Sequence, residues 1–312
     1  MTGGNGHSTL LFFSKAPGRV VSLVPSMTQS LFELGLGDYL VGVTDYCMPP
    51  PQALARMARV GGTLTPDIDR ILSLQPDLVL ANQEENPRSA VETLEREGVK
   101  VWVTFPRSVV EAVSVLWAIV GLFRANHARS LLEALEISLD WTARASSAQR
   151  NSRVFCPIWS GESPLAGQWW MTANGRTYLS DVLEICGGEN IFAHRDRRFP
   201  EEADLGLASS EPVGDRDNRY PRVLPAEVVQ ARPEVILLPS EPYSFSGTQI
   251  AWMKDLLAET PAVRTGRILA VDGTLLTWHG TRLGRALAEL PSLLASESPT
   301  ADPAASESST AS

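Results

Sequence analysis

Side chains that can bind metals follow short apolar segments of the sequence. Glu84 follows the apolar run 78–81, Cys47 follows the run 40–43, and His279 stands in a loop near the C-terminus. Imidazole, thiolate and carboxylate groups are ligands of transition metals. Cys47, Glu84 and His279 are therefore one candidate mixed metal site, with His279 as its principal ligand, although their separation matches no known ligand spacing.

Polar groups gather after two of the apolar runs. Glu84, Glu85 and Asn86 lie together after one run, and Glu241 lies after another. Carboxylates in such positions can hold a cation, contact the polar rim of a ligand or remain solvated. The sequence leaves these three interpretations open.

Many aromatic residues lie in or beside the same predicted loops. An aromatic ring in a loop exposes apolar surface unless something covers it. A large flat ligand would cover these rings, and so would an interface between two lobes; both interpretations remain open. The full set of candidate ligand-binding residues is Ser26, Tyr46, Cys47, Asn82, Glu84, Glu85, Asn86, Trp159, Trp169, Trp170, Tyr178, Tyr220, Glu241, Tyr243, Trp278 and His279.

Sequence signatures of common enzyme classes are absent. The chain has no GxxxxGK[ST], no HExxH and no GxSxG, and no GxGxxG follows its first apolar run. We therefore predict no catalytic residue, no intrinsic cofactor and no dinucleotide-binding fold of the usual kind.

Composition and charge narrow the class of protein. The chain has 312 residues, of which 44% are hydrophobic and 20% charged, and a formal net charge of −9. These values are typical of a globular protein with two domains, and the acidic balance excludes nucleic acid as an expected partner. The three cysteines show no CxxC spacing, so neither a disulfide framework nor a structural zinc site is expected.

Apolar runs alternate with helical patterns in two blocks. Strands are predicted at 19–24, 40–43, 78–81 and 99–104 in the first block, and at 153–158, 168–171, 235–238 and 267–271 in the second. Continuous apolar strands between helices are typical of parallel sheets covered on both faces. A long helix, capped by Asn126 and ending near Ala148, separates the blocks, and residues 193–219 are expected to form a long surface loop.

This pattern predicts an α/β fold of two Rossmann-like parallel-sheet lobes, joined by one long backbone helix. Ligands of parallel sheets bind beyond the carboxyl ends of the strands, so a ligand cleft is expected between the lobes. The predicted parts are an N-terminal extension (1–17), an N-terminal lobe (18–107), connecting helices (108–150), a C-terminal lobe (151–295) and a disordered tail (296–312).

The N-terminus does not resemble a secretion signal. Its apolar stretch, 10–13, is shorter than the roughly 7–15 residues of a signal-peptide core, and no basic segment precedes it. We therefore expect a cytoplasmic location for the chain as written, and an extracytoplasmic location if the start site is misassigned.

Four segments carry a family pattern: RVVSLVPS at 19–26, VGV at 41–43 with the prolines that follow, DRILSLQPDLV at 69–79, and VLEICGGENIF at 182–192. With these segments the chain resembles the helical-backbone metal receptors. That class of substrate-binding proteins includes cobalamin-, siderophore- and haem-binding members of ABC transporters. The resemblance covers about residues 18–295.

The resemblance implies two lobes joined by a long helix, with a metal chelate bound between them. It also implies docking on a membrane permease through one acidic residue of each lobe, at the positions of Asp69 and Glu227. Tyr220 matches an aromatic position of the cobalamin pocket. Thr63 and Asn82 stand where cobalamin-binding members have tryptophans, so the pocket differs from theirs.

The sequence thus predicts a monomeric substrate-binding protein that holds a cobalamin-like corrinoid, or a chelate of the siderophore or haem type, for ABC-type uptake. A cytoplasmic metal- or cofactor-handling enzyme on the same two-lobe fold is the alternative, as is a carrier or sensor. In the enzyme, Cys47, His279 and the glutamates would perform the chemistry.

Overall fold

The first parallel sheet lies in the N-terminal half of the chain. A computed structural model describes residues 15–295, apart from the side chain of Leu54. The sheet has the strand order β3-β2-β1-β4-β5, and all neighbouring pairs are parallel. Its strands are β1 (Val20–Ser22), β2 (Leu40–Val43), β3 (Ala58–Arg59), β4 (Leu78–Asn82) and β5 (Val101–Thr104). β1 and β4 are completely buried, as expected of apolar strands covered on both faces.

The second parallel sheet lies in the C-terminal half and has the order β12-β11-β6-β9. Its strands are β6 (Ser152–Phe155), β9 (Gly188–Asn190), β11 (Val235–Pro239) and β12 (Ile268–Val271). The two predicted parallel-sheet lobes are confirmed. The short edge strand β9 was not predicted, because its residues do not form an apolar run. It is a strand because it pairs with β6.

A small antiparallel sheet was not predicted. It consists of β7 (Trp159–Ser163), β8 (Gly167–Met171) and β10 (Arg222–Val223), in the order β10-β8-β7. The predicted strand at 153–158 leaves Trp159 and Ser160 in the loop that follows it, but both residues begin β7 and pair with β8.

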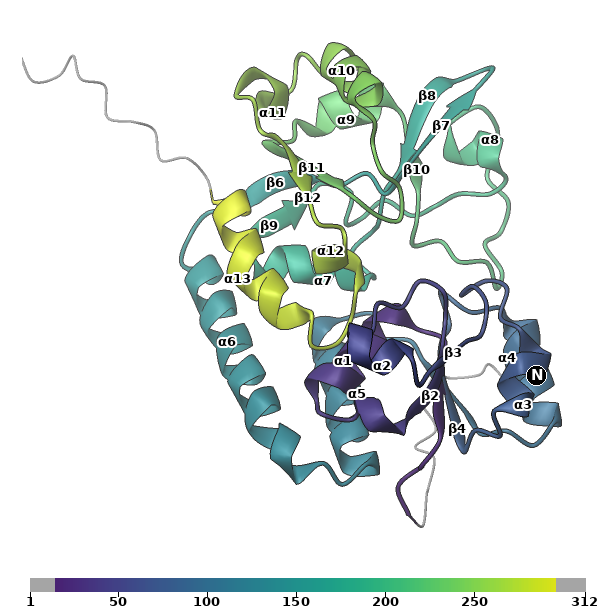
Figure 1. The fold of residues 1–312 in the computed structure, drawn as a ribbon. Coiled ribbons are helices and arrows are strands. Elements are labelled where there is room, and N and C mark those ends of the chain that lie inside the picture. Colours follow the sequence, from purple (N-terminus) through teal and green to yellow (C-terminus); the bar gives the residue numbers. More distant parts are fainter. Residues whose placement is uncertain (1–14, 296–312) are drawn as a thin grey trace, which may run out of the picture.

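The helices largely follow the predicted pattern (Figure 1). Those up to the connecting region are α1 (Pro25–Glu33), η1 (Gly37–Tyr39), α2 (Pro51–Leu54), α3 (Ile68–Ser73), α4 (Arg88–Arg96), α5 (Val109–Leu122), η2 (Asn126–Ala128) and α6 (Arg129–Ser147). Those after it are α7 (Tyr178–Ile185), α8 (Glu201–Asp204), α9 (Pro225–Ala231), α10 (Gly247–Leu256), α11 (Pro261–Arg264), α12 (Thr274–Thr277) and α13 (Leu283–Leu294).

Helix α6 is the predicted backbone helix and runs beside both lobes (Figure 1). It has 19 residues and packs against α5, α7 and α13. The prediction that Asn126 caps it is wrong, because Asn126 begins the 3-10 turn η2 and Ala128 precedes the helix. Trp141 of this helix is 75% exposed.

One hydrophobic core extends through both lobes and the connecting helices. Leu31 of α1, Leu116 of α5, Leu132 of α6, Leu183 of α7 and Leu290 of α13 are all completely buried in it. A shared, close-packed core resists relative movement of the lobes. The domain boundaries given above remain a prediction, and their tail at 296–312 lies outside the described residues.

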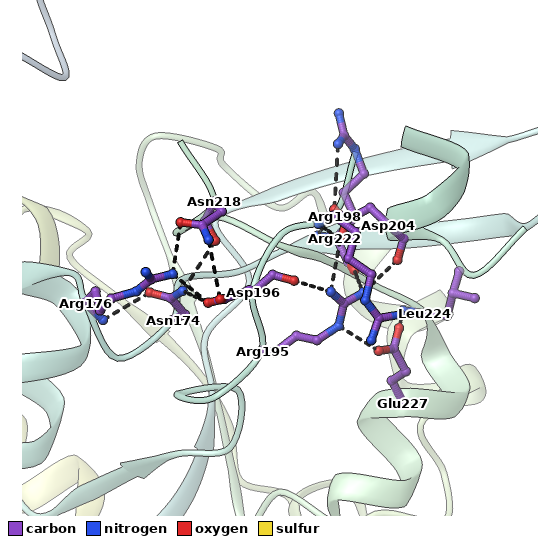
Figure 2. A network of polar contacts seen from close by, with 10 residues as sticks. All are labelled: Asn174, Arg176, Arg195, Asp196, Arg198, Asp204, Asn218, Arg222, Leu224 and Glu227. Atoms are coloured by element: carbon purple, nitrogen blue, oxygen red, sulfur yellow. Dashed lines mark hydrogen bonds and ion pairs between the residues drawn. The ribbon is translucent and has the colours of Figure 1, made fainter. Parts of the chain in front are cut away.

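The segment 193–219 contains α8 and a dense polar network instead of a simple surface loop (Figure 2). Asp204 is completely buried and accepts hydrogen bonds from Arg195 Nη1 (3.1 Å) and from the backbone N–H groups of Arg198 (3.0 Å) and Arg222 (2.8 Å). Arg195 also donates to Glu227. Hydrogen bonding therefore orders a segment that lacks apolar periodicity.

A second part of this network surrounds Asp196. Its carboxylate accepts hydrogen bonds from Arg176 (2.6 Å), Asn174 (2.9 Å) and Asn218 (3.3 Å) (Figure 2). These contacts hold the segment against the residues that precede α7.

Within residues 15–295, no helix combines the length and apolarity needed to cross a membrane.

Candidate functional site

The loop at the carboxyl end of β4 in the N-terminal lobe meets the segment that precedes β10 in the C-terminal lobe. The Tyr220 hydroxyl of the C-terminal lobe donates a hydrogen bond of 2.5 Å to Glu84 Oε1, which follows β4 in the N-terminal lobe. Arg219 Nη2 lies 2.9 Å from the same oxygen. We call Glu84, Arg219 and Tyr220 the interlobe bridge.

Arg219 is held on several sides at once. It forms two hydrogen bonds with Asp217, of 2.9 and 2.6 Å, in addition to its ion pair with Glu84. Its guanidinium lies 4.6 Å from the ring centroid of Phe105, which follows β5. The sequence analysis missed Arg219, whose only signal was its position next to Tyr220. Two carboxylates neutralise its charge.

The Glu85 carboxyl lies within electrostatic range of two other carboxyl groups. Burial, reinforced by the charges of Glu84 and Glu241, raises the pKa of Glu85 to about 8. Because Glu241 follows β11, this influence acts from one lobe to the other. We call Glu84, Glu85 and Glu241 the acidic cluster. At neutral pH Glu85 keeps its proton most of the time and can donate a hydrogen bond.

The two asparagines beside this cluster have different roles. Asn86 is fixed, because its Nδ2 donates to the carbonyls of Leu23 (3.2 Å) and Thr63 (3.0 Å) and its Oδ1 accepts from the backbone N–H of Asn82. Asn82 Oδ1 accepts from the Glu84 backbone N–H (2.8 Å). Among the described residues, the buried Nδ2 of Asn82 has no hydrogen-bond partner.

Glu241 is positioned by close backbone packing. Its Oε1 accepts a hydrogen bond from the Thr277 hydroxyl (2.8 Å). A Cβ atom on Gly273 would lie 2.5 Å from the Glu241 carbonyl oxygen, so only glycine allows this approach.

An aromatic group lies in the same region. The ring of Tyr243 packs against Trp159 (5.1 Å between centroids) and against Phe245 (5.0 Å), and Trp159 is 46% exposed. Partly exposed rings in contact with one another offer flat apolar area to a ligand. We call Trp159, Tyr243 and Phe245 the aromatic group; Phe245 was not among the candidates from the sequence.

His279 is buried and packs edge-on against Tyr178, with ring centroids 5.0 Å apart. Burial lowers its pKa to about 4, so the imidazole is neutral. Cys47 is buried elsewhere, with its Sγ 3.1 Å from the hydroxyl oxygens of Thr28 and Thr44. Among residues 15–295, no three or more His, Cys, Asp or Glu side chains are placed so that they could hold a metal ion. The predicted mixed metal site is therefore wrong for this part of the chain.

Several other candidates lie away from any ligand-accessible surface. Trp170 is buried against Phe155, and Trp169 is buried beneath the guanidinium of Arg222, 4.9 Å from its centroid. Trp170 belongs to the hydrophobic core around Phe155, whereas Trp169 faces the other side of β8 and packs over Gly161. Both rings are buried, although the sequence placed them among the candidate ligand contacts. Ser26 is buried in α1.

The remaining candidates occupy mixed environments. Tyr46 is exposed after β2. Tyr178 is buried, and its hydroxyl lies 3.5 Å from the carbonyl oxygen of the half-buried Trp278. The contacts that define the interlobe bridge involve none of these three side chains.

The two candidate docking residues differ in environment. Asp69 is exposed in the first turn of α3. Glu227 is half-buried at the start of α9, where it accepts from the Leu224 backbone N–H (3.0 Å) and from Arg195 Nε (3.2 Å). Glu227 is thus already engaged in capping its own helix.

A cavity of about 440 Å³ lies elsewhere, between α6 and α13, with Trp141, Cys186 and Leu287 in its lining. Its lining includes no residue of the loops that follow β4 and β11. The candidate site rests instead on the interlobe bridge, together with the carboxyl and aromatic side chains that follow β11.

The raised pKa of Glu85 makes stability depend on pH. Between about pH 4.5 and pH 8 the folded protein keeps a proton that the unfolded chain releases, so this carboxyl group lowers stability as pH rises. Glu85→Gln should therefore recover about 2 kcal/mol of unfolding free energy at pH 9 and change little at pH 4. Denaturant unfolding at several pH values measures the difference.

Glu95→Gln serves as the matched control, because Glu95 is exposed on α4. Its difference from wild type should be the same at each pH. A Glu85→Gln difference that is equally flat would show that the Glu85 carboxyl is ionised in the folded protein at neutral pH.

Comparisons with known proteins agree with this geometry. The family described as periplasmic binding protein matches residues 20–275. The vitamin B12-binding protein of Photorhabdus laumondii is 31% identical over 211 residues, covering 64% of this chain and 73% of that protein. The vitamin B12-binding protein of Yersinia pestis is 26% identical over 257 residues, covering 82% and 81%.

Solved structures share the fold. The periplasmic vitamin B12-binding protein BtuF of Vibrio cholerae matches with a TM-score of 0.67 and 25% identity, covering 89% of this chain and 96% of that one. The periplasmic haem-binding protein RhuT of Roseiflexus matches with a TM-score of 0.63 and 22% identity, covering 90% and 98%.

Proposed function

Because the chain belongs to the periplasmic binding protein family, we propose that it is the substrate-binding component of an ABC-type uptake system for a metal chelate. A corrinoid of the cobalamin type is the favoured ligand. The observation that carries this proposal is the contact between the loop after β4 and the segment before β10, which joins the lobes through Glu84 and Tyr220. Parallel sheets bind ligands at this end of their strands.

The names of the relatives support the corrinoid. Two of them, at 31% and 26% identity, are vitamin B12-binding proteins, and so is the structurally similar protein of Vibrio cholerae. All of these names describe binding proteins, in agreement with a role without catalysis. The periplasmic setting of the similar solved structures favours the extracytoplasmic location over the cytoplasmic one.

The aromatic group and the acidic cluster would contact different parts of the ligand. Trp159 and Tyr243 would cover one face of a flat macrocycle, while Glu85 and Glu241 would contact its polar rim. Ligand pockets commonly combine aromatic area with a few oriented polar groups.

A permease would complete the transport system. Asp69, exposed on α3, and Glu227, at the start of α9, are the proposed contacts. Glu227 would exchange its contact with Arg195 for a basic side chain of the permease.

The test is a calorimetric titration with cobalamin, cobinamide, haem and a panel of iron-siderophores. Micromolar or tighter binding of a corrinoid is the expected result. Folded protein that binds none of these chelates would overturn the proposal.

Trp159→Ala should weaken binding of that chelate by about tenfold, because one aromatic contact contributes about 1–1.5 kcal/mol. Trp252 on α10 is a matched control, with 43% of its surface exposed compared with 46% for Trp159. Equal effects of Trp159→Ala and Trp252→Ala would remove Trp159 from the site.

A further inference from the structure

The outward face of α6 carries an exposed apolar stripe. Four exposed residues, spaced three or four positions apart, lie on this side of the helix: Ala134, Ile137, Trp141 and Ala145. Ile137 is 61% exposed and Trp141 75%, more than any other tryptophan of residues 15–295. Because α6 runs along the outer edge of the molecule (Figure 1), another protein can reach this stripe. Exposed apolar patches of this kind mark interaction sites.

The cavity of about 440 Å³ between α6 and α13 opens beside the stripe, and Trp141 belongs to its lining. The apolar residues that α13 contributes to this lining are Leu287, Pro291 and Leu294. A helix returns to nearly the same direction after eleven and eighteen residues, so Leu131 shares the flank of Thr142 and Gln149, which line the cavity. Leu131 is itself 40% exposed. The stripe, the cavity and an exposed leucine therefore belong to one surface.

The charges on the opposite flank of the stripe suit a reversed copy of the same helix. Glu133 lies six residues before position 139, and Arg144 lies five residues after it on the same flank. A two-fold axis at position 139 between antiparallel helices brings Glu133 of one copy level with Arg144 of the other, within about 1.5 Å along the helix. Arg144 pairs with the exposed Asp140 at 2.8 Å and retains N–H groups for a second carboxylate. The same axis places Ile137 of each copy opposite Trp141 of the other.

We propose that α6 forms the interface of a two-fold symmetric homodimer. In this dimer, Trp141 of each copy packs on Ile137 of the other. Glu133 forms an ion pair with Arg144 of the second copy, and Leu131 enters the second copy's cavity between α6 and α13. The dimer replaces the monomer expected from the sequence. It does not depend on the function proposed above, because the interlobe bridge lies outside α6.

The dimer should be weak. α6 has 19 residues and is about 28 Å long, so its face is smaller than the roughly 800 Å² per partner of a standard interface. Sedimentation velocity of the full-length protein should show a reversible monomer–dimer equilibrium with a Kd of about 10–100 µM. Trp141→Ala should raise this Kd at least about tenfold, because the ring lies near the centre of the interface. Trp252→Ala, at the 43% exposed tryptophan of α10, is the matched control and should leave the Kd unchanged.

Charge reversal tests the antiparallel arrangement. Glu133→Arg alone places two arginines opposite each other in both halves of the dimer, and Arg144→Glu alone places two glutamates there. Each variant should therefore self-associate more weakly than the wild type. In a mixture of the two variants, a heterodimer regains both ion pairs and should be at least about tenfold tighter than either homodimer. Sedimentation with a fluorescent label on one variant measures the heterodimer, and circular dichroism verifies that each variant is folded.

Three results would overturn the inference. Wild-type protein that stays monomeric well above the expected Kd would leave the stripe to another occupant. Equal effects of Trp141→Ala and Trp252→Ala on dimerisation would place the interface elsewhere. A mixture of Glu133→Arg and Arg144→Glu that associates no more tightly than each variant alone would exclude the antiparallel pairing. Calorimetric binding of a chelate tests the proposed function separately, so its failure is distinguishable from a failure of the dimer.

Discussion

Replacing Asp204 with alanine should lower the free energy of unfolding by about 3–5 kcal/mol, because it leaves two backbone N–H groups without their acceptor and takes one of two carboxylate partners from the buried Arg195. The Asp204 side chain is completely buried and accepts from Arg195 Nη1 and from two backbone N–H groups, those of Arg198 and Arg222. Alanine would remove all three hydrogen bonds at once. Arg195, 12% exposed, would remain beside the vacated position. Denaturant unfolding with a fixed slope measures the loss.

An exposed ion pair provides the control for this prediction. Glu92 pairs with Arg88 one helical turn away on α4, and both side chains are at least half exposed. Glu92→Ala should cost less than about 0.5 kcal/mol. A loss of less than about 1 kcal/mol for Asp204→Ala would show that the network around α8 does not stabilise the C-terminal lobe.

Gly280→Ala should cost about 2–4 kcal/mol because it damages the junction between the lobes. Gly280 has a φ of +100°, and a Cβ atom there would lie 2.2 Å from Ser30 Oγ. Ser30 lies on α1 and accepts from the Thr281 backbone N–H (3.1 Å). The added methyl group would have to displace the Ser30 hydroxyl and this interlobe hydrogen bond. Thermal unfolding monitored by circular dichroism measures the effect.

Two further variants separate the collision from backbone strain. Gly206 also has a positive φ, +76°, but a Cβ atom there meets nothing within 4 Å, so Gly206→Ala should cost only about 1 kcal/mol. Ser30→Ala combined with Gly280→Ala should recover part of the loss, because the atom that collides is gone. Equal losses for Gly206→Ala and Gly280→Ala would contradict the close packing of the lobes.

Local sequence patterns determined most of the fold. The strands at 40–43 and 235–238 were predictable because a continuous apolar run is a property of a few neighbouring positions. Prediction failed for Trp159 and for the strand Gly188–Asn190, where pairing with a distant segment decides the structure. At such positions, pairing with a distant strand outweighs the local conformational preference of the residues.

The candidate site also combines features that the sequence predicts with contacts that only the tertiary structure creates. The sequence determined that carboxylates and aromatic rings follow the strands, and hence that Glu84, Glu85 and Glu241 are near the ends of two sheets. Only the tertiary structure could bring Arg219 and Tyr220 onto Glu84, 136 positions away from Tyr220 in the chain.

The sequence also did not show which tryptophan side chains are buried. Trp169 and Trp170 look like Trp159 as residue types, yet the pairing of β8 between β7 and β10 buries the first two and leaves Trp159 exposed. The sequence by itself determined two parallel-sheet lobes and the carboxylates at their edges, because local periodicity encodes strands and helices. The tertiary structure alone decided which side chains meet between the lobes, because long-range packing sets their distances, burial and charge.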